Sequence, residues 1–153
     1  MKPLFTLAIV LTSFTLTAFA DSSSNINNLT SVNRKAINSF QKSFHNAEVI
    51  SWEVKGNLYK VTFNSNDKTM YAYYNAEGDQ IAVSRNIHID QLPLSLSMEL
   101  KEKFNDSWLT DLFEVSANGE TSYYATVANA TTTTIYKTEG ITGWTTFKKD
   151  RRK

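Results

Sequence analysis

The sequence has 153 residues, a formal net charge of +1 and no cysteine. A chain so close to neutral lacks the strongly basic surface that nucleic-acid binding requires, and without thiols it has no disulfides, thiolate metal sites or cysteine nucleophiles. A domain of this size buries about two thirds of the surface that its unfolded chain exposes, so we expect packing alone to stabilise it.

The first 20 residues have the three parts of a secretory signal peptide. Lys2 precedes an apolar run from Leu4 to Phe19, and Ala18-Phe19-Ala20 has the small-residue pattern of a cleavage site. Serine and threonine dilute the run and no stop-transfer pattern follows it, which favours a signal peptide over a membrane anchor. We therefore predict cleavage after residue 20, export to the periplasm or beyond the cell, and no stable membrane anchor after cleavage.

A first helix is expected soon after the predicted cleavage site. Residues 21–30 are rich in serine and asparagine and predict a disordered N-terminus. Ser31 can cap a helix in which Ile37, Phe40 and Phe44 share one face. The ordered domain is therefore predicted to begin at residue 31.

A second helix is expected near the middle of the chain. It begins at Leu92-Pro93, because proline suits a first helical turn, and Leu96, Leu100 and Phe104 recur at four-residue spacing. Spacing of this kind places the three apolar side chains on one face of the helix.

The segments that follow the two helices are similar in kind and order. Each helix precedes a strand, a glycine turn (Lys55-Gly56-Asn57 or Asn118-Gly119-Glu120), an alternating strand, a polar break and a further strand. Matched landmarks lie roughly sixty residues apart, which is typical of an internal repeat. We predict an α+β fold made of a tandem repeat of helix plus antiparallel hairpins, with the helices packed on one face of an antiparallel sheet. The alternative is an unrepeated α+β domain.

The predicted domain spans residues 31–150, with repeats at 31–90 and 91–150 and a basic tail at 151–153. Strand alternation places Trp52 with Ile50 and Val54 on the side facing the helices. We expect Trp52 and Phe104 to be buried core residues, one in each half.

The face away from the helices is the candidate binding surface. Alternation places Tyr71 and Tyr73 there beside Lys60, with Tyr124 as a neighbour in the second half. Tyrosine combines a rigid apolar ring with a polar tip, which suits protein recognition. The alternative interpretation is that these tyrosines are present because tyrosine favours strands.

The sequence marks no catalytic, cofactor-binding or metal-binding residues. Its two histidines are His45, which follows the first helix, and His88, which could share a metal ion with Asp90 but has no evident third ligand. Acidic residues are available for glycosidic chemistry, but no pair stands out. We therefore expect a protein that is not an enzyme and uses no cofactor.

The chain contains a series of core and turn residues, within a resemblance that covers roughly residues 33–150: Phe44, Ala47, Val49, Trp52, Gly56, Tyr59, Val61, Phe63, Ala72, Tyr74, Gly78 and Leu92-Pro93. This series resembles the secreted PepSY-like proteins, small exported bacterial domains that are similar to the β-lactamase inhibitor protein. The resemblance implies a tandem α/β repeat, a bacterial envelope location and a protein-binding or peptidase-inhibiting role. It supplies no catalytic or inhibitory residues.

These observations predict an exported, non-catalytic binding module whose partner is an envelope or secreted protein and not a nucleic acid. Two alternatives from other classes stay open. One is a small hydrolase of envelope glycans with an unrecognised carboxylate pair. The other is a structural subunit that self-associates through an exposed strand edge.

Overall fold

The computed structural model describes residues 31–104, 106–141 and 143–152. The predicted signal peptide at 1–20 and the predicted disordered segment at 21–30 lie outside the described residues.

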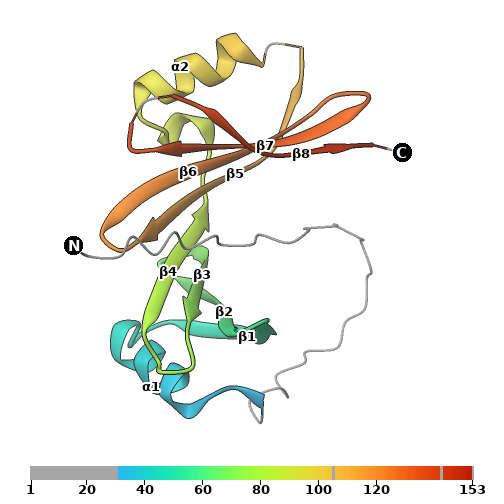
Figure 1. Cartoon of the computed structure of the whole chain (residues 1–153). Coiled ribbons are helices and arrows are strands. Elements are labelled where there is room, and N and C mark those ends of the chain that lie inside the picture. The colour runs from blue at the N-terminus through green and yellow to red at the C-terminus, as the bar shows by residue number, and fades with distance from the viewer. Residues whose placement is uncertain (1–30, 105, 142, 153) are drawn as a thin grey trace, which may run out of the picture.

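One antiparallel sheet of eight strands runs through the described chain in sequence order, so that each strand pairs with the next (Figure 1). The strands are β1 (Glu48–Lys55), β2 (Leu58–Ser65), β3 (Lys68–Tyr74), β4 (Gln80–Asn86), β5 (Trp108–Ala117), β6 (Glu120–Ala128), β7 (Thr132–Glu139) and β8 (Thr145–Arg151). Two ten-residue helices, α1 (Arg34–Ser43) and α2 (Leu94–Lys103), precede β1 and β5, and a short 3-10 helix η2 (Ile89–Gln91) precedes α2.

The predicted fold class, an α+β tandem repeat with helices packed on the sheet, is wrong. β4 pairs with β3 on one side and with β5 on the other, so the two predicted repeats are parts of one continuous sheet. Across this junction Arg85 donates hydrogen bonds of 2.9 and 2.6 Å to one carboxylate oxygen of Glu114. Close backbone contacts are almost all between neighbouring strands, and the two short helices add few. The protein is therefore mostly β.

The first helix begins later than predicted because a different residue caps it. The side-chain oxygen of Asn33, not Ser31, accepts a hydrogen bond of 2.8 Å from the Lys35 backbone N–H. The side-chain amide of Asn33 also donates to the carbonyl of Ala76 at 2.7 Å, in the turn between β3 and β4. In that turn Gly78 has φ of +90°, and a Cβ atom there would lie 2.9 Å from Lys35 atoms. Helix and turn therefore approach closely only because residue 78 has no side chain.

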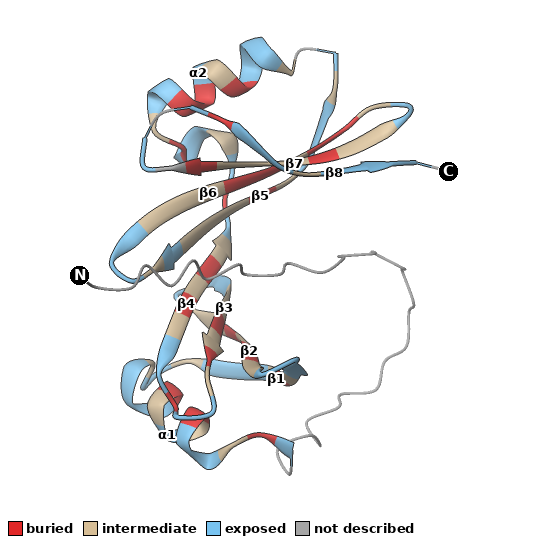
Figure 2. Cartoon of the chain, viewed as in Figure 1, coloured by how far each residue is buried: buried red, intermediate tan, exposed pale blue. Residues whose placement is uncertain are grey.

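A first group of buried residues, the aromatic cluster, lies between α1 and β1–β3 (Figure 2). Its centre is Phe40, whose ring centroid lies 5.0 Å from that of Phe63 and 5.7 Å from that of Trp52, in edge-to-face contacts. Tyr74 packs beside Trp52 at 6.2 Å. Trp52 is buried, which confirms its predicted place in the core.

A second group, the leucine cluster, lies between α2 and β5–β7. Its buried members are Ile87, Leu92, Leu96, Leu100, Leu112, Ala125 and Trp144. Phe104 packs against this cluster, with its ring centroid 4.4 Å from that of Tyr136, but it is half-buried and so only partly fits the prediction.

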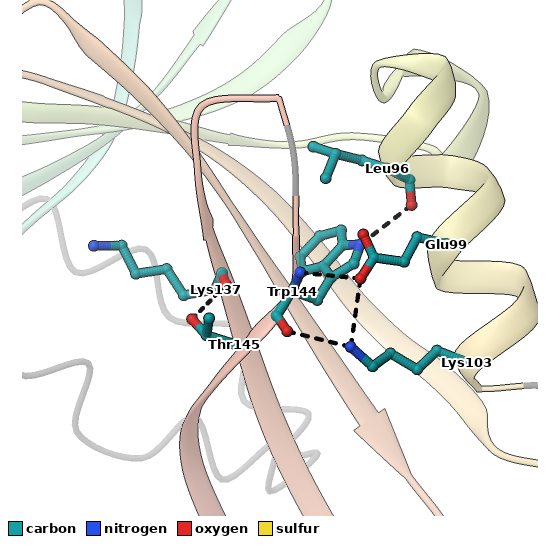
Figure 3. Close-up of polar contacts among 6 residues, drawn as sticks. All are labelled: Leu96, Glu99, Lys103, Lys137, Trp144 and Thr145. Carbon is teal, nitrogen blue, oxygen red and sulfur yellow. Dashed lines mark hydrogen bonds and ion pairs between the residues drawn. The ribbon is translucent and has the colours of Figure 1, made fainter.

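Trp144 connects α2 to the start of β8 (Figure 3). Its indole Nε1 donates to the carbonyl of Leu96 at 3.2 Å, and its backbone N–H donates to Glu99 Oε1 at 3.3 Å. Lys103 Nζ in turn donates to Glu99 Oε1 and to the Trp144 carbonyl, both at 3.4 Å. Three of these contacts therefore join α2 to the segment before β8, and the fourth, between Lys103 and Glu99, lies within the helix.

The two edge strands differ from the sequence-based expectations. Ile50 and Val54 were predicted to lie under the helices with Trp52, yet they are 45% and 49% exposed. β1 is an outer strand with an irregular register between Val49 and Ser51, so only one of its sides is paired with another strand. At the other edge Arg151, the first residue of the predicted basic tail, is the last residue of β8.

Tight turns join the strands. The Asn118-Gly119 turn between β5 and β6 has φ of +53° and +79°, as its sequence predicted for a hairpin turn. Between β6 and β7 the Asn129 side-chain oxygen accepts hydrogen bonds from the backbone N–H groups of Thr131 and Thr132, at 3.0 and 2.9 Å. This asparagine fixes a turn whose register the sequence did not reveal.

Candidate functional site

One side of the sheet carries neither buried cluster, and we call it the open face. Tyr71 pairs with Ser84, Ser84 with Val115, and Phe113 with Tyr124. Residues that pair directly across antiparallel strands point to the same side, so these five side chains share the open face. The alternate positions on the same strands, such as those of the leucine cluster, point the other way.

A cavity of about 150 Å³ lies in the open face and is lined by residues from β3 to β8. Four aromatic side chains contribute to its walls: Tyr71, Tyr73, Phe113 and Tyr124. The charged lining residues are Asp111, Lys148 and Asp150. Because β4 and β5 are adjacent, strands that are far apart in the sequence build one site.

The structure brings the four predicted surface residues together. Tyr71, Tyr73 and Tyr124 all line the cavity, and Lys60 Nζ lies 4.8 Å from the centroid of the Tyr71 ring. Tyr71 and Tyr73 are half-buried, whereas Tyr124 is buried among the side chains of the open face, with its ring 5.5 Å from that of Phe147. Their binding role stays a prediction.

Lys60 is more enclosed than the sequence suggested. It is 7% exposed and lies 3.5 Å from Glu53, which also contacts Lys55 at 2.7 Å. Burial alone would raise the pKa of Glu53, but the hydrogen bond and charge of Lys55 and the charge of Lys60 outweigh it and lower that pKa. Lys60 is thus a paired cation beside the Tyr71 ring and contributes to the edge of the site.

The phenols of Tyr71 and Tyr73 stay protonated at neutral pH. Burial raises the pKa of Tyr71, and the negative charges of Asp111 and Glu53 raise it further. Burial also raises the pKa of Tyr73, against the opposing hydrogen bond with Ser84. Both hydroxyl groups can therefore donate hydrogen bonds to a bound group.

The charged lining residues are not equivalent. Lys148 and Asp150 form an ion pair of 2.8 Å on β8. Asp111 accepts a hydrogen bond of 3.2 Å from the Thr110 hydroxyl, and among the described residues it forms no ion pair. The cavity therefore contains one carboxylate that is not balanced by a basic side chain.

Four lining residues were not predicted from the sequence: Asp111, Phe113, Lys148 and Asp150. Asp111 and Phe113 flank the buried Leu112 with the alternation of a two-sided strand, which is a usable local signal. Their position beside Tyr71, however, depends on the pairing of β4 with β5, which no local pattern specifies. Lys148 and Asp150 were assigned no role from the sequence.

No group of three or more metal-ligating side chains occurs in the described part of the chain. His45 and His88 are both exposed, and neither lines the cavity. Of the helices described, none is both long and apolar enough to span a membrane.

Comparison with known proteins identifies the fold. The sequence matches no family model and no curated protein. A candidate periplasmic protein from Bacteroides eggerthii has a similar structure, with a TM-score of 0.69 and 10% identity over 78% of this chain and 88% of that chain. A DUF2874 family protein from Bacteroides uniformis gives a TM-score of 0.69 with 11% identity, over 78% of this chain and 89% of its own.

A BLIP-like protein from Bacteroides fragilis is also similar, with a TM-score of 0.62 and 17% identity over 78% of this chain and 85% of that one. At such low identities the likeness concerns the fold alone. The chain thus has the fold of DUF2874 and BLIP-like proteins, in agreement with one part of the resemblance drawn from the sequence. The PepSY part of that resemblance is not shown and stays a prediction.

Proposed function

We propose that the protein is an exported, non-catalytic module that binds another protein through the open face. The observation that carries this proposal is the aromatic cavity on a side of the sheet that neither buried cluster occupies. Half-buried tyrosines at a hollow in a surface are typical anchors of protein interfaces, because their rings bury area at low entropic cost.

The size of the cavity favours a protein partner over a small ligand or cofactor. Its volume of about 150 Å³ is smaller than the ~300–1,000 Å³ of typical small-molecule pockets. A space of this size accepts one side chain of a partner whose remaining contacts spread over the surrounding sheet.

Two further observations support the location and the type of partner. The predicted signal peptide and the candidate periplasmic protein from Bacteroides eggerthii both favour export. The BLIP-like neighbour favours a protein partner in the envelope or outside the cell.

One observation supports the glycan-hydrolase alternative: Asp111 and Asp150, which could form the pair of carboxylates that such an enzyme needs, both line the cavity. Two features weigh against it. One oxygen of Asp150 contacts Lys148 at 2.8 Å, and the volume is small for a sugar ring together with attacking water. Hydrolysis of an envelope glycan by the wild type, lost in the Asp111→Asn variant while that variant still binds the glycan, would favour the hydrolase.

The experiment that tests the proposal is capture of a partner from an envelope extract by the immobilised protein. We expect the Tyr71→Ala/Tyr73→Ala variant to weaken capture about thirtyfold, since anchor residues contribute about 2 kcal/mol or more. Each substitution should leave the free energy of unfolding within about 1 kcal/mol of that of the wild type. Trp108→Ala is the control, because Trp108 is an exposed aromatic residue outside the cavity. Equal capture by the double variant, or its failure to fold, would contradict the proposal.

Self-association through an edge strand is the remaining alternative, and β1 provides an observation for it. Val49, Ile50 and Val54 are exposed on this outer strand. Size-exclusion chromatography over a range of concentrations distinguishes the two ideas. A dimer that Ile50→Lys converts to a monomer would favour self-association, whereas a monomer throughout is expected here.

A further inference from the structure

We infer that the cavity of the open face receives an arginine side chain of the protein partner. This inference rests on the proposed function and specifies the chemistry of the group that enters the site.

The aromatic walls of the cavity favour two kinds of entering group, an apolar side chain or a cation. Ring faces attract cations as well as apolar groups, and two tyrosines of the cavity already have a lysine nearby. Lys60 Nζ lies 4.8 Å from the Tyr71 centroid, and Lys137 Nζ lies 5.9 Å from the Tyr124 centroid. Neither lysine lines the cavity itself.

The charge of the lining residues favours a cation over an apolar side chain. The Lys148–Asp150 pair is neutral as a unit, which leaves Asp111 as the uncompensated charge. Asp111 lies close enough to the Tyr71 phenol for its charge to raise the pKa of that group. An apolar side chain would displace water from this carboxylate and leave it unpaired, which is unfavourable, whereas a cation would pair with it.

Arginine fits these neighbours better than lysine. A guanidinium group is planar, stacks on aromatic rings, and can donate two parallel hydrogen bonds to one carboxylate. It is also more weakly hydrated than an ammonium group, so it loses less on entering an aromatic cavity. Phe113 and the tyrosines supply the stacking surfaces, and Asp111 supplies the acceptor.

The test uses a defined probe with the purified protein. N-acetyl-arginine amide is titrated against N-acetyl-citrulline amide, which has nearly the same shape but no charge. Binding is followed by the NMR signals of the tyrosine and phenylalanine rings. We expect the arginine probe to shift the ring signals of Tyr71, Tyr73, Phe113 and Tyr124 and to bind about tenfold more tightly than the citrulline probe.

Asp111→Asn should weaken arginine binding about tenfold and remove most of the difference between the two probes. Asp106→Asn is the matched control, because Asp106 is exposed and lies outside the cavity. Should Asp111→Asn not fold, the comparison of the two probes on the wild type still decides the question. A lysine probe that binds as tightly as the arginine probe would overturn the preference for a guanidinium group.

Three results would overturn the inference as a whole: equal affinity for the two probes, ring signals that arginine does not shift, or a folded Asp111→Asn variant with unchanged binding. These results are distinct from failure of the proposed function. Capture that depends on Tyr71 and Tyr73 but not on Asp111 would preserve protein binding by the open face and reject arginine as the inserted group.

Discussion

The two buried clusters are stabilised by different kinds of contact. In the aromatic cluster Phe40, Trp52 and Phe63 make edge-to-face ring contacts, and shape complementarity among the rings holds α1 in place. In the leucine cluster the aliphatic side chains pack around Trp144, and hydrogen bonds from this residue hold α2. Two helices of equal length are therefore held by ring packing in one case and by aliphatic packing together with hydrogen bonds in the other.

The largest expected effect is the removal of a ring from the aromatic cluster. Trp52→Ala should lower the free energy of unfolding by about 3–5 kcal/mol, because it loses transfer energy and leaves a cavity. Phe104→Ala, at the border of the leucine cluster, should cost about 2 kcal/mol because its ring is only half-buried. Urea denaturation of both variants measures the two values. A larger loss of unfolding free energy for Phe104→Ala than for Trp52→Ala would contradict this prediction.

Alkaline pH should weaken the aromatic cluster next. Burial raises the pKa of Tyr74 from 10.0 to about 12, so the folded protein retains a proton that the unfolded chain releases earlier. The resulting stability is complete below pH 10 and is lost as the pH rises towards about 12. Two pKa units correspond to about 2.7 kcal/mol, and solvent near the partly buried hydroxyl makes the expected loss smaller than that, on the order of 2 kcal/mol.

The Tyr74→Phe variant isolates this contribution. Its free energy of unfolding should fall less than that of the wild type over the same pH range, in denaturant titrations at each pH. The pKa of Tyr123, which packs on the leucine cluster, is also raised by burial and by Glu114, so alkali should weaken both regions. Identical pH profiles for wild type and Tyr74→Phe would show that Tyr74 does not contribute.

Loss of one hydrogen bond should weaken the leucine cluster by a smaller amount. Trp144→Phe keeps a ring but leaves the Leu96 carbonyl without its indole donor. We expect a cost of about 1–2 kcal/mol, measured by thermal or urea unfolding. The control is Trp108→Phe at a residue that is 64% exposed, which should change stability by less than about 0.5 kcal/mol. Equal effects of the two substitutions would argue against a stabilising role for the indole contact.

The smallest expected effect concerns the carboxylate between α2 and Trp144. Glu99→Gln keeps an oxygen for the Trp144 backbone N–H but removes the charge that faces Lys103. We expect a loss of about 0.5 kcal/mol that decreases as salt is added, because the ion pair is partly exposed. Glu102→Gln on the same helix is the control, since Glu102 is exposed. Salt-independent loss would indicate that the charge has no role.

Sequence patterns predicted the structural features that depend only on residues close together in the chain, such as the side of a strand on which a side chain lies. Alternation within β1 and β3 was enough to place Trp52 in the core and Tyr71 with Tyr73 on the other side, because a strand side chain's direction follows from its parity. Alternation did not predict that Ile50 would be exposed, since Ile50 lies at a register irregularity of an edge strand that simple alternation does not reveal.

The errors in the predicted fold have a non-local cause. β4 was not recognised as a strand, and without it the chain divides into two similar halves. Its pairing with β5 makes one sheet and brings Asp111 and Phe113 beside Tyr71. Such pairing depends on register between segments that are separated by a helix, and no local sequence pattern encodes it. The half of the site that comes from β5 to β8 was therefore largely missed.

The order of the strands along the chain has a consequence for how fast the protein folds. Because each strand pairs with the next one, most strand contacts join residues that are close in sequence, and closing the intervening loops costs little entropy. Folding rates rise as this mean separation falls, so we expect the protein to fold faster than β-sandwiches of equal size. The Asn118-Gly119 turn has the backbone that a hairpin needs, so the β5–β6 hairpin is the expected nucleus. Substitutions in this hairpin should then slow folding, whereas substitutions in the edge strands should mainly speed unfolding.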